Sequence, residues 1–201
     1  EYTLADGTQL VLNTATALDV VETSTTRLIR LYEGEIFIRT GQGAKGVAAA
    51  KALQVHTEQG TVVPLGTVFT VRKLSTSTQV TVLEDVVELI PQSAGGKTQR
   101  LVAGEQAQMS SVDVEVATVS DQADSWTRGL LVAVDWPLSR LVAELSRYRT
   151  GVLRCAPSIA GLRVSGAFPI DDTDRALQAI ANALPVSVDR LTQYWVTLKS
   201  S

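Results

Sequence analysis

The sequence predicts a mainly β protein in two subdomains: an N-terminal, all-antiparallel β subdomain and a smaller α+β subdomain with the order βαββαββ. Residues 1–119 alternate apolar and polar side chains over short stretches, which is typical of half-buried strands. Beyond residue 130, two stretches repeat their apolar residues every three or four positions, as helices do. The charge balance changes as well, from −4 over residues 1–120 (9 basic, 13 acidic) to +1 over residues 121–201 (9 basic, 8 acidic).

Six stretches of the first subdomain have the period of two that predicts a strand, and they are rich in valine, threonine and isoleucine. They cover residues 8–13, 27–33, 35–39, 67–73, 78–84 and 113–119. Turn signals such as Asp6-Gly7, Gly60 and Gly104 lie between them. Many short strands at this spacing predict a two-sheet or coiled all-β unit over residues 1–119.

Gly66 and Thr67 interrupt the apolar run of residues 63–73. Glycine accepts a positive φ or a close backbone approach that other residues do not. The hydroxyl of Thr67 can then bond the local backbone. We therefore predict a corner at which the chain passes from one sheet to another, and no ligand site.

Residues 41–52 are small and flexible, and we expect a mobile loop with a helix-prone tail. Their glycines resemble a dinucleotide-binding pattern, but the surrounding βαβ unit that such a site needs is missing. Residues 120–129 are expected to form a linker with a short helix, capped by Ser120 or Asp121 and ended by Gly129.

The second subdomain, residues 130–201, begins with a predicted buried strand over residues 130–136. Pro137 is expected at the first position of a helix. The apolar stripe of that helix comprises Leu138, Leu141, Val142, Leu145 and Tyr148.

Short strands are predicted next at 152–155 and 163–168. Asp171 or Asp172 is expected to cap a second helix, which Pro185 ends. Two alternating stretches, 186–191 and 193–199, then predict a closing hairpin.

The composition excludes several classes of protein. The 201 residues are 45% hydrophobic and 19% charged, with a net charge of −3, so nothing favours binding to DNA. The single cysteine, Cys155, cannot form an internal disulfide or a zinc site by itself, and we expect a buried, inert thiol. No run of 18 apolar residues indicates a membrane span. The chain starts at Glu1, and we expect a piece of a longer protein whose membrane anchor lies upstream.

No set of residues meets the demands of catalysis. His56 is the only histidine, and no nucleophile motif accompanies it. Asp171, Asp172 and Asp174 crowd a helix start, where the helix dipole explains them better than calcium does. We therefore expect no enzyme, no cofactor and no metal.

Five segments come in an order and spacing that resemble the FecR family of periplasmic sigma-regulator domains. They are LADGTQLVLN, RLIRLYEGEIFIRT, VHTEQGTVVPLGTVFTVR, VTVLEDVVELI and RLVAGEQAQM. Residues 126–148 and 162–188 resemble the family's C-terminal portion, which is similar to the short secretin/TonB N-terminal domain. Asp85 stands where the family often has glycine, and aspartate tolerates a left-handed conformation. Trp136 stands where a small capping residue is commoner, so a helix cap is lost unless Asp135 substitutes for it.

The resemblance implies the periplasmic, signal-receiving region of a regulator with a single span in the inner membrane. Its partners would be the N-terminal signalling domain of an outer-membrane TonB-dependent siderophore transporter, a sigma factor held by a cytoplasmic part, and periplasmic or intramembrane proteases. Docking would permit release of the sigma factor and transcription of iron-uptake genes. Switching by a hinge, by ordering or by exposure of a cleavage site would each be compatible with this role.

Residues 121–201 have nine basic residues, and eight of them are arginines, which are enriched at protein interfaces together with aromatic residues. We expect free sheet edges at residues 152–155 and 194–199, where a partner strand can add. The predicted partner-binding residues are Tyr148, Arg149, Arg154, Arg163 and Trp195. A periplasmic carbohydrate- or peptidoglycan-binding β module is the alternative. It would need exposed aromatic side chains in the first subdomain, which has Tyr2, Tyr32, Phe37 and Phe69.

Overall fold

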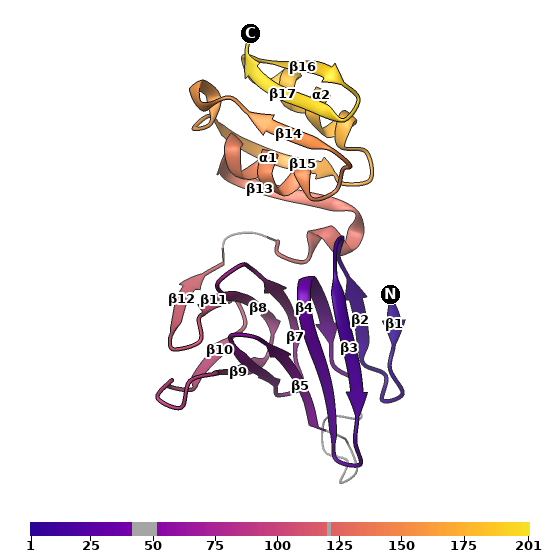
Figure 1. Cartoon of the computed structure of the whole chain (residues 1–201), viewed down its shortest axis with the longest axis vertical. Coiled ribbons are helices and arrows are strands. Elements are labelled where there is room, and N and C mark those ends of the chain that lie inside the picture. The colour runs from indigo at the N-terminus through magenta and orange to yellow at the C-terminus, as the bar shows by residue number, and fades with distance from the viewer. Residues whose placement is uncertain (42–51, 120–121) are drawn as a thin grey trace. The chain divides into compact units, whose positions relative to one another are not determined.

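The computed structural model describes residues 1–41, 52–119 and 122–201, which belong to two compact units, Glu1–Ser120 and Asp121–Ser201 (Figure 1). The first unit consists of strands, and the second combines two α-helices with five strands. The predicted mainly β class, with a small α+β region at the C-terminus, is confirmed. No helix among the described residues is long and apolar enough to cross a membrane.

The strands of the first unit form one continuous sheet of 12 strands. Their bounds are β1 Tyr2–Thr3, β2 Gln9–Leu12, β3 Ala17–Glu22, β4 Thr26–Arg39, β5 Ala52–Thr57, β6 Gly60–Pro64, β7 Val68–Lys73, β8 Thr78–Glu84, β9 Val86–Pro91, β10 Gln99–Val102, β11 Glu105–Met109 and β12 Val114–Thr118.

The long strand β4 divides this sheet into two halves because its two ends pair with different neighbours (Figure 1). We call the order β1-β2-β4-β7-β8-β11-β12 half-sheet 1 and the order β3-β4-β5-β6-β9-β10 half-sheet 2. Side chains from both halves form a single hydrophobic core. Its fully buried members include Ile29, Ile36, Phe69, Leu89 and Met109.

Two features of the first unit differ from the sequence prediction. The stretches 27–33 and 35–39 form one strand, β4, because Gly34 bends the chain without interrupting its pairing. The unit is also not wholly antiparallel, since β4 and β5 pair in parallel. A parallel pair needs a long connection, and β4 and β5 are far enough apart in the sequence for one, since β4 ends at Arg39 and β5 begins at Ala52. The loop predicted at 41–52 falls largely on residues 42–51, which lie outside the described residues.

The chain passes from one half-sheet to the other at residues with a positive φ. The described passages occur at Ala15 (φ 52°), Gly34 (86°), Gly66 (79°), Asp85 (60°) and Gly104 (85°). Each lies between strands of different halves, or within β4 where its partners change. The predicted corner at Gly66-Thr67 is confirmed, and so is the left-handed conformation of Asp85.

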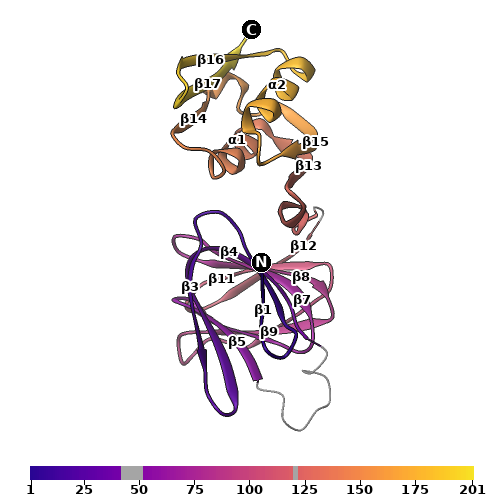
Figure 2. The same cartoon turned by 90° about the vertical axis from the view of Figure 1, so that its right-hand side faces the viewer.

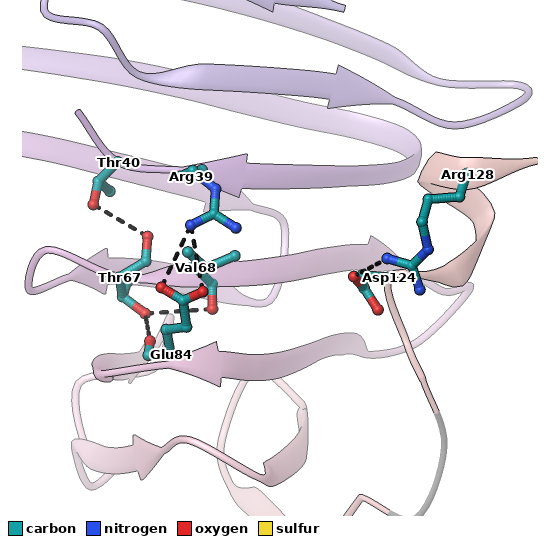
Figure 3. Close-up of polar contacts among 7 residues, drawn as sticks. All are labelled: Arg39, Thr40, Thr67, Val68, Glu84, Asp124 and Arg128. Carbon is teal, nitrogen blue, oxygen red and sulfur yellow. Dashed lines mark hydrogen bonds and ion pairs between the residues drawn. The ribbon is translucent and has the colours of Figure 1, made fainter.

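Thr67 joins three strand ends at its corner (Figure 3). Its carbonyl oxygen accepts hydrogen bonds from the amide and the hydroxyl of Thr40, both at 3.1 Å. Its own hydroxyl donates to the carbonyl oxygen of Glu84, at the end of β8. The side chain of Glu84 forms a 3.3 Å ion pair with Arg39, the last residue of β4. The 1% exposed Thr67 therefore fastens β7 to β4 and β8 from inside the fold.

Gly34 is held at a second corner by close contact. A Cβ atom at this position would collide with Thr16 and with the carbonyl oxygen of Ala15. The hydroxyl of Thr16 bonds the carbonyl oxygens of Asn13 at 2.7 Å and Glu35 at 3.1 Å. The corner before β3 therefore packs directly on the bend of β4.

A buried arginine lies next to the turn of the hairpin formed by β3 and β4. The side chain of Arg27 is 3% exposed and forms 2.6 Å ion pairs with Asp6 and with Glu22. Asp6 also accepts a 2.9 Å hydrogen bond from the amide of Thr8. Burial opposes ionisation of Asp6, but the bonds from Thr8 and Arg27 outweigh it and lower the pKa of this carboxyl.

The second unit has the predicted order βαββαββ. Its elements are η2 Ser125–Arg128, β13 Leu130–Pro137, α1 Leu138–Ser146, β14 Val152–Cys155, η3 Pro157–Ile159, β15 Arg163–Pro169, α2 Thr173–Ala183, β16 Val186–Thr192 and β17 Trp195–Ser200. Strands β13 and β15 form one sheet, and β14-β17-β16 form another. Both helices contact strands of both sheets and lie between them (Figure 2). Buried leucines of α1 and α2 fill the core.

Several local predictions for this unit are refined. The short helix before β13 begins only at Ser125, and Ser120 and Asp121 lie outside the described residues. A 2.7 Å bond from Arg128 to Asp124 closes it (Figure 3), and Gly129 ends it at φ 77° as predicted. Strand β13 alternates between buried and exposed residues, so it is not a fully buried strand.

The caps of the two α-helices differ from each other. Pro137 precedes α1 instead of starting it, and no side chain caps this helix. Asp135 does not replace the cap, because it lies in a β-bulge at φ 53°. At α2, Asp172 accepts a 2.9 Å bond from the amide of Arg175, which confirms the predicted cap.

Three glycine substitutions separate backbone strain from steric collision. We expect Gly104→Ala to lower the free energy of unfolding by about 1–2 kcal/mol, since its φ is 85° but the space around it is open. Gly34→Ala should cost more, because a collision with Thr16 adds to the strain. Gly95→Ala, with open space and no left-handed φ, is the control and should be neutral or slightly stabilising. Urea denaturation followed by far-ultraviolet circular dichroism measures all three. Equal effects of Gly34→Ala and Gly95→Ala would contradict the corner model.

Removal of the Thr67 hydroxyl tests the hydrogen bonds at the corner. Thr67→Val keeps the shape but leaves the Glu84 carbonyl without this donor, so we expect a loss of about 1–3 kcal/mol in unfolding free energy. Thr118→Val, at an exposed position of β12, is the matched control and should change stability by less than about 0.5 kcal/mol. If both variants unfold at the same urea concentration, Thr67 does not fasten the strands.

The lowered pKa of Asp6 predicts a pH dependence. A carboxyl with a lowered folded-state pKa stabilises the fold above its unfolded pKa of about 3.9, and this contribution disappears as the pH falls through the folded value. Asp6→Asn should therefore cost about 1–2 kcal/mol at pH 7, and progressively less below about pH 4. Asp189→Asn removes an exposed ion pair and serves as the control. A cost for Asp6→Asn that persists unchanged at pH 2 would exclude ionisation as its cause.

Candidate protein-docking site

Two of the five predicted site residues meet on the three-stranded sheet of the second unit. Arg154 of β14 lies over the ring of Trp195 of β17, with 4.8 Å between the guanidinium carbon and the ring centroid. The two strands pair in parallel, and Val152 is the register partner of Trp195. Trp195 remains 39% exposed, so the stacked pair presents a cation and an aromatic face to solvent.

The hairpin between β16 and β17 adds two exposed apolar side chains to this pair. Leu191 is 80% exposed and Tyr194 is 55% exposed. A β-bulge between Arg190 and Thr192 leaves Leu191 outside the ladder. We call Arg154, Leu191, Tyr194 and Trp195 the hairpin surface.

Sequence reasoning missed Leu191 and Tyr194, although the alternation carried a signal. Val186 and Val188 face the core side of β16, and Leu191 is out of phase with them. An apolar residue in the outward phase of a strand is a candidate for an interface.

Arg149 holds this hairpin in place through hydrogen bonds of its buried side chain. Its side chain is 8% exposed and donates to Asp174 at 3.2 Å and to the carbonyl oxygen of Gln193 at 3.1 Å. Arg190 bonds the same carboxylate at 3.1 Å. The bonds from Arg190 and then Arg149 lower the pKa of Asp174, although partial burial acts in the opposite direction. Arg149 therefore connects the hairpin to the start of α2 and is not exposed for a partner.

Tyr148 and Arg163 belong to other elements than the stacked pair. Tyr148 follows the end of α1 and is half-buried, with the guanidinium of Arg147 5.8 Å from its ring centroid. Arg163 is on β15, in the two-stranded sheet, where it donates to the carbonyl oxygen of Asp135 at 2.8 Å. Its side chain is 63% exposed.

The sheet that holds the hairpin surface has two edge strands, β14 and β16, and β14 carries Arg154. This strand pairs with β17 alone among the described residues, so its other edge has unpaired backbone groups. The prediction that residues 152–155 form an edge is confirmed. The same prediction for residues 194–199 is wrong, because β17 lies between β14 and β16. A parallel pairing across the sheet, which alternation does not reveal, places the last strand in the middle.

His56 and Cys155, the two residues with the most reactive side chains in the sequence analysis, both lie in strands. His56 of β5 is 3.2 Å from the amide oxygen of Gln54, and partial burial with the charge of Arg30 lowers its pKa, so the ring is neutral at pH 7. Burial raises the pKa of the half-buried Cys155 thiol, which reduces its reactivity. Within residues 1–41, 52–119 and 122–201, no three His, Cys, Asp or Glu side chains gather to hold a metal.

The aromatic residues of the first unit divide into two pairs. Phe37 and Phe69 are buried, whereas Tyr2 and Tyr32 are 62% and 52% exposed. A glycan-binding face formed by all four is therefore excluded.

Comparisons with known proteins agree with this fold. Residues 1–88 match the family model described as FecR protein. A crystal structure at 1.65 Å of a protein from Parabacteroides distasonis ATCC 8503, provisionally assigned as an anti-sigma factor, aligns with a TM-score of 0.75 at 23% identity. The alignment covers 100% of this chain and 93% of that chain, and a 2.50 Å structure with the same description gives a TM-score of 0.74. No curated protein matches the sequence.

The family match covers the strands up to β9, including the corners at Gly34, Gly66 and Asp85. The solved structures extend the shared fold over the whole chain. The predicted resemblance to the FecR family is confirmed over residues 1–88.

Proposed function

We propose that this chain is the periplasmic signal-receiving region of an inner-membrane sigma regulator. In this role it binds the N-terminal signalling domain of an outer-membrane TonB-dependent siderophore transporter. Binding controls the release of a sigma factor and the transcription of iron-uptake genes. The observation that carries the proposal is the match of residues 1–88 to the FecR family model. The exposed side chains of Leu191, Tyr194 and Trp195 in the second unit support it.

The fold of the whole chain supports this proposal. It is shared from end to end with the Parabacteroides distasonis protein, which is provisionally assigned as an anti-sigma factor. The positions of the titratable residues favour a binding protein, since His56 and Cys155 serve strand packing and not a reactive centre.

The hairpin surface and the edge of β14 provide two modes of recognition side by side. A partner that has its own sheet can add a strand to β14 through main-chain hydrogen bonds. Trp195 and Arg154 then act as anchors next to that strand, since tryptophan, tyrosine and arginine dominate the energetics of interfaces. Arg149 acts indirectly, by holding the hairpin in place.

Arg163 and Tyr148 remain part of the proposed site, but as separate contacts. Arg163 lies on the two-stranded sheet and Tyr148 at the end of α1. Single substitutions of each measure whether the partner extends beyond the hairpin surface.

The experiment is a binding titration of this chain with purified signalling domains of TonB-dependent siderophore transporters. We expect one of these domains to bind saturably. A complete lack of binding across the transporters of the source organism would refute the proposed partner class.

Substitutions on the hairpin surface test whether the partner binds there. Trp195→Ala and Arg154→Glu should each weaken binding by at least about 2 kcal/mol, a roughly 30-fold increase in Kd, because they remove a central anchor. Isothermal titration calorimetry measures this change. Arg175→Glu makes the same charge change at an exposed position of α2 and should leave Kd within about threefold. Unchanged affinity in both Trp195→Ala and Arg154→Glu would place the interface elsewhere.

A further inference from the structure

A cleft of about 470 Å³ opens in the first unit between edges of the two half-sheets. Its walls come from β1 and β2 on one side and from β3 on the other. No ladder joins β3 to β1 or β2 among the described residues. The lining includes Tyr2, Leu4, Leu12, Leu18, Val20 and Tyr32. The cleft is therefore the seam at which the folded sheet fails to close.

At the seam, side chains on the core-facing side of β3 are exposed to solvent. Leu18 and Leu12 pack against the core but are only partly buried. Val20 has the same phase as Leu18 and is 40% exposed. Apolar side chains that face inward and yet contact solvent indicate room for further apolar groups.

Strand β3 has six residues and, within the part of the chain that the structure describes, pairs only with β4. In that part its backbone is unpaired on the cleft side. Its sequence, ALDVVE, contains neither the lysine nor the proline that usually protects an edge strand. Its free N–H and C=O groups can therefore accept an additional strand.

The charges around the cleft are mainly acidic. Asp19 is the single charged residue of the lining, and it accepts a 2.9 Å hydrogen bond from the Tyr32 hydroxyl. Glu1 and Glu33 are exposed and adjoin lining residues, Glu33 as the register partner of Ala17. Arg30 is the register partner of Asp19, and the N-terminal ammonium group belongs to Glu1. Three carboxylates against one guanidinium and one ammonium group leave a negative balance, which favours a basic ligand.

We propose that this cleft binds an extended peptide segment of a partner protein as an additional strand on β3. Apolar residues at every second position of the segment contact Leu18, Val20 and Leu12. A lysine or arginine on the opposite face of the segment lies next to Asp19, which points away from Val20 along β3. This site lies in the first unit and is independent of the hairpin surface and of its partner. A second copy of the chain fits less well, because it would bring two acidic edges together.

The test uses a synthetic peptide of nine residues that alternates threonine and valine around a central lysine. Binding to the isotope-labelled chain is followed by NMR titration and amide hydrogen exchange. We expect saturable shifts and slower exchange in Ala17–Glu22. The same peptide with its five central amides N-methylated should not bind, because it lacks the donors for strand pairing.

Two pairs of variants make the test specific. Val20→Lys places a charge in the cleft and should weaken peptide binding at least about tenfold, whereas Val116→Lys, on the edge strand β12, should leave it unchanged. Asp19→Asn should abolish the preference for the lysine peptide over the same peptide with a central glutamate. Both valines are about equally exposed, so the two lysine variants should fold alike.

Each other outcome overturns the proposal. Shifts confined to β12, or equal binding by Val20→Lys and Val116→Lys, would show non-specific edge pairing. A dimer in light scattering that Val20→Lys abolishes would assign the cleft to a second copy. Binding of peptidoglycan fragments in competition with the peptide would assign Tyr2 and Tyr32 to a glycan site. Absence of any shift at millimolar peptide would leave the seam without a ligand of this class.

Discussion

The first unit depends on a backbone constraint: the chain must bend sharply each time it passes between the two half-sheets. Ala15, Gly34, Gly66, Asp85 and Gly104 meet this constraint with a positive φ. A left-handed residue costs about 1–2 kcal/mol unless it is glycine, so three of the five positions are glycines. The corners allow one long strand, β4, to serve both halves, and they bring both apolar faces onto one core.

The same arrangement determines where the molecule is free to bind. A sheet that folds back on itself without closing leaves free edges, and β3 lies at one of them beside an apolar seam. In the second unit, two small sheets enclose two helices, and the edge strand β14 lies next to the stacked Arg154 and Trp195. Each unit therefore combines an unpaired strand edge with exposed apolar side chains, which is the chemistry of recognition by added strands.

Alternation in the sequence predicted the mainly β class, the βαββαββ order and the corner at Thr67, because these follow from local patterns. It did not predict strands such as β3 and β10, where exposed apolar residues or a short length blur the period of two. Alternation also could not predict which strands pair when they are far apart in the sequence. The parallel pairs of β4 with β5 and of β14 with β17 depend on chain crossings, so the edge assigned to residues 194–199 was wrong. Arg154 and Trp195, both predicted as partner-binding residues, are in contact in the fold. Composition alone could not show that Arg149, predicted with them, is buried and bonded within the chain.

The central proposal is that this chain, whose residues 1–88 match the FecR family model, binds its partner through the second unit. Hydrogen exchange with mass spectrometry, on the chain alone and in complex with a transporter signalling domain, tests this claim most directly. The account predicts slower exchange on complex formation in Val152–Cys155 and in the hairpin that joins β16 to β17. Protection restricted to the two-stranded sheet of β13 and β15, or the same exchange with and without the partner, would contradict it.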